Sequence, residues 1–181
     1  NIRAQQGLAD LNKSNQNNAK QIPSKEITDQ LINLYNQGQL LAVVEQSKAL
    51  TGQYPEAFII WNILGISAVQ LKMLDEAIDA LKKCISLKPD YVEAYINMGV
   101  ALKDQGKLEE AIEAYNKALL LKPDYAVSYS NMGNTLKAQG KLEEAIEAYN
   151  KALSLKPDFA DVYVNMGNTL KAQGKLEEAI Q

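Results

Sequence analysis

The segment NMGNTLKAQGKLEEAI, from Asn131 to Ile146, recurs without a change from Asn165 to Ile180, 34 residues further along the chain. The same spacing separates four prolines, which are Pro55, Pro89, Pro123 and Pro157. A fixed period of this size is typical of a stacked repeat array, in which each unit buries its apolar face against its neighbours. The repeat therefore predicts a solenoid rather than one globular core with a central cleft.

Each repeat carries the pattern of two short amphipathic helices joined by a tight turn. In the copy at 92–125, apolar and small residues recur at i, i+3, i+4 and i+7 from Tyr95 to Leu102. Gly106 then stands where a left-handed residue commonly ends a helix. We expect Lys122 in the last turn of the second helix, and Asp124 as a cap for the next one. The predicted fold is all-α, a right-handed superhelical solenoid of antiparallel helix pairs.

The period also divides the chain into six parts. These are 1–23, a short helix and polar linker; 24–57, a degenerate repeat; 58–91, 92–125 and 126–159, three complete repeats; and 160–181, a truncated repeat. Because the chain starts at Asn1 rather than Met and stops within a repeat, we expect it to be a piece of a longer protein. The last short helix, from Leu176 to Gln181, would leave an apolar inner face uncovered, which predicts self-association there.

The composition excludes several classes of function. The net charge is −3, the pI is about 5.1, and a single Arg accompanies 18 Lys, which argues against nucleic acid and anionic membranes as partners. The sequence has no His, and its one Cys, Cys84, can form neither an internal disulfide nor a zinc site. No apolar run approaches the roughly 18 residues of a membrane span. We expect a cytoplasmic chain that is not an enzyme and needs no cofactor or metal.

The repeats resemble the tetratricopeptide repeat (TPR) family, whose pattern is W-x2-L-G-x2-Y, then A-x3-F, then P. The matching residues of the complete copies are Trp61, Leu64, Gly65, Ala77, Leu81 and Pro89; Tyr95, Met98, Gly99, Ala111, Tyr115 and Pro123; and Tyr129, Met132, Gly133, Ala145, Tyr149 and Pro157. A fourth copy begins at Tyr163. The resemblance covers about residues 24–181 and extends to the repeat arrays attached to bacterial transferases.

Glycine in the middle of a helix costs about 1 kcal/mol relative to Ala, so its recurrence at Gly65, Gly99, Gly133 and Gly167 indicates a repeated need. We predict that the paired helix approaches too closely for a side chain. The small partners would be Ala77, Ala111, Ala145 and Ala179, and the large residues of the register would be Tyr95, Tyr129 and Tyr163. Trp61 and Cys84 are predicted to be core residues, and the Glu-rich starts of the second helices to be solvated.

The resemblance to TPR proteins implies a concave groove, lined by the first helices, that binds an extended peptide. The candidate contacts are Asn97, Asn131 and Asn165; Asn134 and Asn168; Ser130; and Lys103, Lys137 and Lys171. An Asn amide can both donate to and accept from a peptide backbone, and a Lys row attracts acidic segments. The Asn ladder is similar to that of the O-linked N-acetylglucosamine transferases. Because Ile96, Ser130 and Val164 are not basic, the family's carboxylate clamp is not expected, and Ile63 and Ile66 predict a more apolar first end.

Other interpretations remain open. Near-identical repeats align any residue, so the Asn and Lys rows could be ordinary solvated positions. The leading hypothesis is a non-enzymatic scaffold that binds a protein or peptide. The alternatives are a substrate-recruiting region of a larger glycosyl-, sulfo- or methyltransferase, and an RNA-binding array like the pentatricopeptide proteins. The acidic charge and the 34-residue period speak against RNA, since the pentatricopeptide period is 35 and its grooves tend to be basic.

Overall fold

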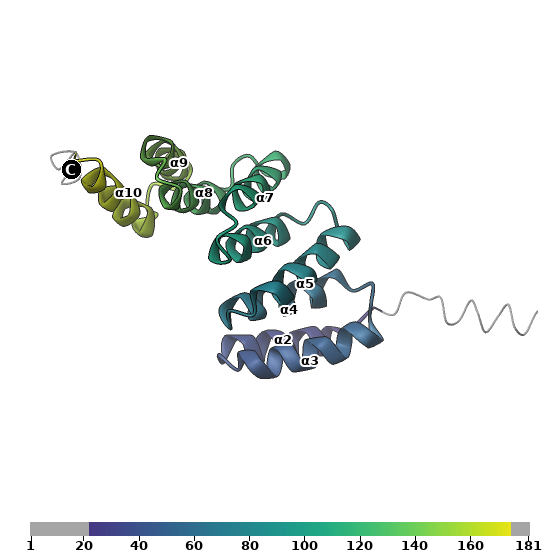
Figure 1. The fold of residues 1–181 in the computed structure, drawn as a ribbon. Helices are drawn as coiled ribbons and strands as arrows, with labels where there is room; N and C mark the ends of the chain where they lie inside the picture. Colours follow the sequence, from purple (N-terminus) through teal and green to yellow (C-terminus); the bar gives the residue numbers. More distant parts are fainter. Residues whose placement is uncertain (1–21, 175–181) are drawn as a thin grey trace, which may run out of the picture.

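The computed structural model of the chain describes residues 22–174, and within this range every regular element is an α-helix. The helices are α2 (Lys25–Asn36), α3 (Leu40–Gln53), α4 (Phe58–Gln70), α5 (Leu74–Leu87), α6 (Val92–Asp104), α7 (Leu108–Leu121), α8 (Ala126–Ala138), α9 (Leu142–Leu155) and α10 (Ala160–Ala172). They stack as pairs along a curved path (Figure 1). The predicted all-α solenoid is confirmed.

The first helix of each repeat lies on the inner side of this curve. Helix α4 contacts α6, α6 contacts α8, and α8 contacts α10. No such contact joins α5, α7 and α9, the second helices of the described repeats, to one another. In a curved array, the helices of the inner layer lie closer together than those of the outer layer. The first helices, which contact one another, therefore form the inner layer. The concave surface is therefore built from α4, α6, α8 and α10.

Left-handed residues end the first helices, as the sequence predicts. Gly106 and Gly140 have φ angles of 82° and 77°, values that L side chains rarely adopt. Lys72 occupies the same place in the first complete repeat, with a φ of 60°. It is a non-glycine residue in a conformation that disfavours a Cβ.

The need for glycine in the middle of the first helices and the close contact with the paired helix are confirmed at three positions, but the predicted small partner is wrong. A Cβ on Gly133 would lie 2.5 Å from the Tyr149 ring. At Gly65 a Cβ would lie 2.6 Å from Leu81, and Gly99 faces the Tyr115 ring in the same way. The space beside each of these glycines, here called the glycine notch, is filled by a large side chain of the second helix. This side chain stands at the F position of A-x3-F and is not the predicted small Ala.

The connections between repeats differ from the predicted capping. Helix α7 ends at Leu121, Tyr125 is the N-cap residue of α8, and no side chain caps that helix. Asp124 therefore does not serve as a cap. The Lys122 Nζ lies 4.5 Å from the centre of the Tyr125 ring, a cation–π contact that recurs between Lys156 and Phe159. The lysine is thus held by the aromatic residue that directly precedes the first helix of the next repeat.

Aromatic side chains of the first helices form hydrogen bonds with these connections. The Trp61 Nε1 donates a hydrogen bond of 2.9 Å to the Pro55 carbonyl, and the Tyr95 hydroxyl donates one of 3.0 Å to the Pro89 carbonyl. Trp61 also packs against Cys84, which is fully buried, in agreement with the prediction for both residues. Helices α4 and α6 are thereby tied to the prolines that precede them, as is α10 through the Tyr163 hydroxyl, which donates a hydrogen bond of 3.1 Å to the Pro157 carbonyl.

Three expectations concern the ends of the array. The short helix predicted within 1–23 falls at 1–11, which lies outside the described residues, as does the segment from Leu176 to Gln181. The expected uncovered apolar surface can be assessed only on α10, the last described helix, where Tyr163 and Val164 are 50% and 63% exposed. At the other end, Ile63 does not line an apolar stretch of groove, because it is 4% exposed and packs with Leu31 of α2 and Val43 of α3.

Candidate peptide-binding groove

A pocket of about 370 Å³ opens on the concave side between α8 and α10. Its lining residues are Val127, Ser130, Asn131, Asn134, Phe159, Asp161, Val164 and Asn165. Four of them belong to the predicted contacts. They come together because positions 127, 130, 131 and 134 form one stripe of α8, and the α10 positions 34 residues later face the same space.

The two central amides of this pocket are available to a ligand. Asn131 and Asn165 are half-buried, and within residues 22–174 neither side-chain amide forms a hydrogen bond. Their backbone carbonyls accept from Thr135 and Thr169 at 2.9 and 2.7 Å. Both side chains therefore keep a donor and an acceptor for a peptide backbone.

The other asparagines are not equivalent to these two. The Asn97 amide donates to Asn62 Oδ1 at 3.3 Å, across to the preceding repeat. The Asn134 Oδ1 accepts a 2.8 Å hydrogen bond from the Tyr149 hydroxyl. Asn168, one repeat further along, is exposed. The predicted rows thus contain two free amides at the pocket, two engaged ones, and an exposed residue near the end of the array.

Ser130 lines the pocket but is only 5% exposed, so it belongs to the floor and is not the accessible contact that the sequence predicts. The sequence analysis missed Val127, Phe159 and Asp161 as lining residues, and it named Val164 only as a groove position that is not basic. Val127 and Asp161 lie one turn before Asn131 and Asn165, so the helical period could have found them. Phe159 ends the preceding connection, and no periodicity marks it.

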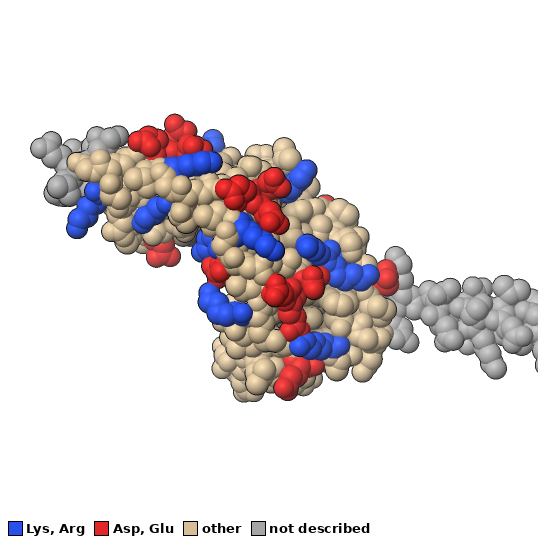
Figure 2. All heavy atoms as spheres, in the orientation of Figure 1, with Lys and Arg blue, Asp and Glu red and all other residues tan. Residues whose placement is uncertain are grey.

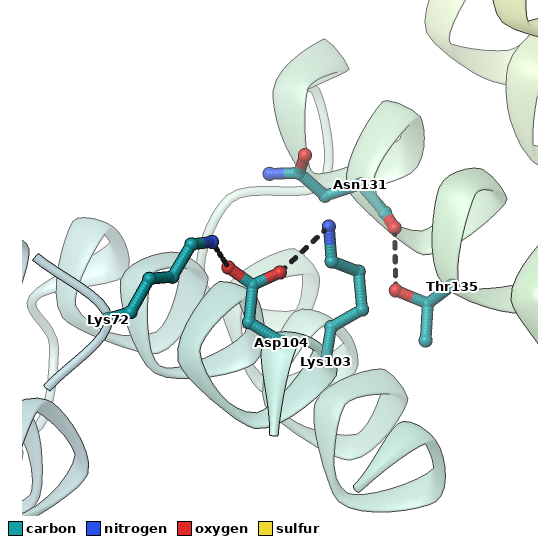
Figure 3. A network of polar contacts seen from close by, with 5 residues as sticks. All are labelled: Lys72, Lys103, Asp104, Asn131 and Thr135. Atoms are coloured by element: carbon teal, nitrogen blue, oxygen red, sulfur yellow. Dashed lines mark hydrogen bonds and ion pairs between the residues drawn. The ribbon is translucent and has the colours of Figure 1, made fainter. Parts of the chain in front are cut away.

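Of the three predicted lysines, Lys103 takes part in an ion-pair network within the described residues (Figure 3). The Lys103 Nζ lies 3.3 Å from Asp104 Oδ1, and the Lys72 Nζ lies 2.6 Å from Asp104 Oδ2. Burial alone would raise the pKa of Asp104, but the Lys72 hydrogen bond and the Lys103 charge outweigh it and hold this pKa below its ordinary value. Lys137 is half-buried and Lys171 is exposed, and neither forms an ion pair with a residue of the described range.

The potential metal ligands and the one thiol of the described part of the chain do not gather into a metal-binding group. No three His, Cys, Asp or Glu side chains of residues 22–174 are placed to hold a metal ion. The Cys84 thiol is buried, and burial raises its pKa to about 12, which makes it a poor nucleophile near neutral pH. The acidic starts of the second helices are exposed, as predicted.

The surface charges are mixed. On the face shown in Figure 2, lysines and acidic side chains alternate over the helices and form no single basic field. In the range that the structure covers, no helix has the length and apolar character required to cross a bilayer. The charges on this face therefore do not single out a recognition surface.

These features define a helical-repeat protein with a concave groove. The sequence model described as "TPR repeat" matches residues 68–106, 101–140 and 133–174, which together cover more than half of the chain. The chain belongs to the TPR repeat family.

Several known proteins are similar to this chain. The peroxisomal targeting signal receptor of Candida albicans (strain SC5314 / ATCC MYA-2876) is 41% identical over 54 residues, which cover 30% of this chain and only 9% of that receptor. A crystal structure of MamA is 28% identical, with a TM-score of 0.73, and the match covers 82% of this chain and 86% of that one. The TPR protein TTC0263 from Thermus thermophilus matches at 19% identity and a TM-score of 0.73, covering 86% and 85% of the two chains, which shows a shared fold alone.

Proposed function

We propose that the chain is a non-enzymatic interaction module that binds an extended peptide segment of a partner protein in the concave groove. The observation that carries this proposal is the pair of half-buried, unengaged amides of Asn131 and Asn165 at one pocket. Membership of the TPR family supports a protein partner, as does the similarity to a receptor whose name refers to a targeting signal.

The pocket suits a peptide backbone better than a small charged molecule. The apolar side chains of Val127, Phe159 and Val164 provide contact area, while the Asn amides provide a donor and an acceptor on each of two adjacent helices. A rigid array that presents these groups in advance leaves the peptide as the component that must be ordered on binding. The ligand is therefore an extended segment, with its main chain held by the amides.

Replacing both amides should weaken binding without changing the fold. A peptide selected on this chain from a random dodecapeptide library is the probe, and its dissociation constant is measured by fluorescence anisotropy. The variant Asn131→Ala/Asn165→Ala loses two sets of hydrogen bonds, so we expect binding to weaken about tenfold or more. Unchanged circular dichroism would show that the helices are intact.

The chain offers a matched control for this experiment. Asn116 and Asn150 are also 34 residues apart, but they are exposed on the second helices α7 and α9. The variant Asn116→Ala/Asn150→Ala should bind the selected peptide within about twofold of the parent, since a surface change of this kind seldom exceeds about 0.5 kcal/mol. Equal losses in both double variants would contradict the groove assignment.

A further inference from the structure

Another pocket opens between α2 and α4, at the other end of the curved array from α8 and α10 (Figure 1). It has a volume of about 480 Å³, and its lining residues are Ile22, Pro23, Thr28, Ile32, Glu56, Ala57, Phe58 and Ile59. Four lining positions of the α8–α10 pocket, 130, 134, 159 and 161, stand three repeats after positions 28, 32, 57 and 59. The two pockets therefore occupy equivalent places in the repeat.

The two pockets differ in their chemistry. Ile32 and Ile59 stand where the α8–α10 pocket has Asn134 and Asp161. The side chain of Ile32 is 43% exposed, and that of Ile22 is 84% exposed. Several apolar side chains that are exposed around one hollow are typical of a surface that another segment covers. The α2–α4 pocket is therefore a candidate docking place for an apolar segment.

The outer face of α2, in contrast, is polar. In later repeats the corresponding face of the first helix packs against the second helix of the preceding repeat, as Ala94 of α6 does in one cluster with Cys84 of α5. On α2 the register of Ala94 is held by Glu26, and Gln30 and Asn33 continue the same helical stripe. All three are exposed. An apolar segment on this face would bury polar groups, which is costly unless each finds a hydrogen-bond partner.

The start of the chain supplies a segment that fits the pocket. Ile22, a lining residue, is the first described residue, so residues 1–21 are tethered at the pocket itself. Within the helix predicted at 1–11, Ala4, Leu8 and Leu11 form an apolar stripe at i, i+4 and i+7. The polar stretch 12–21 can span up to about 33 Å when extended. A segment on so short a tether has an effective concentration in the millimolar range, so even a weak contact forms.

We propose that residues 1–11 form an amphipathic helix that docks in the α2–α4 pocket, with Leu8 and Leu11 against Ile32 and Ile59. The docked helix covers the exposed isoleucine side chains and leaves the polar outer face of α2 in water. It also leaves the α8–α10 pocket open. The docking is independent of the proposed peptide groove, since it concerns a different pocket and an occupant that belongs to the chain. An external ligand reaches the α2–α4 pocket only in competition with this helix.

The test uses the full chain with ¹³C-labelled isoleucine δ1-methyl groups. Leu8→Ser/Leu11→Ser removes the apolar stripe of the segment and changes no residue of α2–α10. Because the leucine side chains leave the pocket in this variant, we expect the methyl signals of Ile32 and Ile59 to shift relative to the parent. The signal of Ile112, on α7, should stay in place.

Two further variants serve as controls. Asn15→Ser/Asn18→Ser, in the polar stretch, should leave the signals of Ile32 and Ile59 where they are in the parent. Ile32→Asn introduces the residue that the later repeats have at this register, at Asn134 for example, so α2 tolerates it. When Ile32→Asn is present, the two Leu→Ser changes should no longer shift the Ile59 signal, because the pocket has already lost its apolar contact.

Three results would overturn the proposal. The first is unchanged Ile32 and Ile59 signals in Leu8→Ser/Leu11→Ser, which would leave the pocket to an external ligand. The second is a shift confined to the side-chain NH₂ signals of Gln30 and Asn33, which would place the segment on the outer face of α2. The third is a change of the parent's methyl signals toward those of the variant over about a tenfold dilution. A tethered contact does not depend on protein concentration, so this last result would assign the pocket to a second copy of the chain.

Discussion

The variant Tyr115→Ala is expected to lower the free energy of unfolding by about 3–5 kcal/mol, the range found when large buried aromatic residues are truncated. Tyr115 is fully buried, and its ring fills the notch at Gly99. Removing the ring would empty the space between α6 and α7, and glycine has no side chain that could fill it. Since native domains have a total stability of only about 5–15 kcal/mol, this loss should be visible as a large shift of the urea midpoint.

A residue on the same helix provides the control for this variant. Leu120 is 75% exposed, at a register where the neighbouring repeats carry Ser86 and Ser154. Leu120→Ala should change the free energy of unfolding by no more than about 0.5 kcal/mol. If Tyr115→Ala destabilised the chain as little as Leu120→Ala, the ring could not be the packing element of the repeat.

The second large effect is expected from the opposite change, in which the notch is narrowed. In Gly99→Ala the added methyl would overlap the Tyr115 ring, and that ring cannot move aside because it is fully buried. Overpacking of this kind typically costs about 1–3 kcal/mol. The cost should exceed the gain in helix propensity, so the variant should unfold at a lower urea concentration than the parent.

Gly52 provides a control in which a Gly→Ala change alters helix propensity without a close contact. It also lies within a helix, α3, but apart from its chain neighbours and the helix's own backbone, no heavy atom lies within 4 Å of a Cβ built on it. Gly52→Ala should therefore stabilise the chain by up to about 1 kcal/mol, the propensity difference alone. If both Gly→Ala variants stabilised the chain, the notch would not be a close contact.

Much of the fold can be predicted from the 34-residue period, because residues at the same register of each repeat have the same packing environment. The left-handed turn at Gly106 and the buried place of Cys84 could both be predicted from their register. The identity of the side chain in the glycine notch could not be predicted in the same way. Periodicity assigns both Ala111 and Tyr115 to the inner face of α7, but it does not say which of the two points at Gly99. The boundaries of the six parts remain predictions.

The candidate groove was predicted less completely than the fold. The stripe of Asn131 and Asn165 follows from register, and the structure places both at one pocket. Residues of the same Asn or Lys row differ in their contacts because some of their neighbours are not conserved from repeat to repeat. Asn62 engages Asn97, and Asp104 pairs with Lys103, although the later repeats have no equivalent contact at these registers within the described residues. These differences arise from residues that depart from the consensus, and the consensus of the aligned repeats does not contain them.

The most direct test of the proposed groove is a titration of the ¹⁵N-labelled chain with the library-selected peptide, followed through the side-chain NH₂ resonances of asparagine. The proposal predicts that the signals of Asn131 and Asn165 shift and saturate together, while those of Asn116 and Asn150 on the second helices do not move. Shifts at Asn116 and Asn150, with Asn131 and Asn165 unchanged, would place the ligand on the outer layer and contradict a concave binding site.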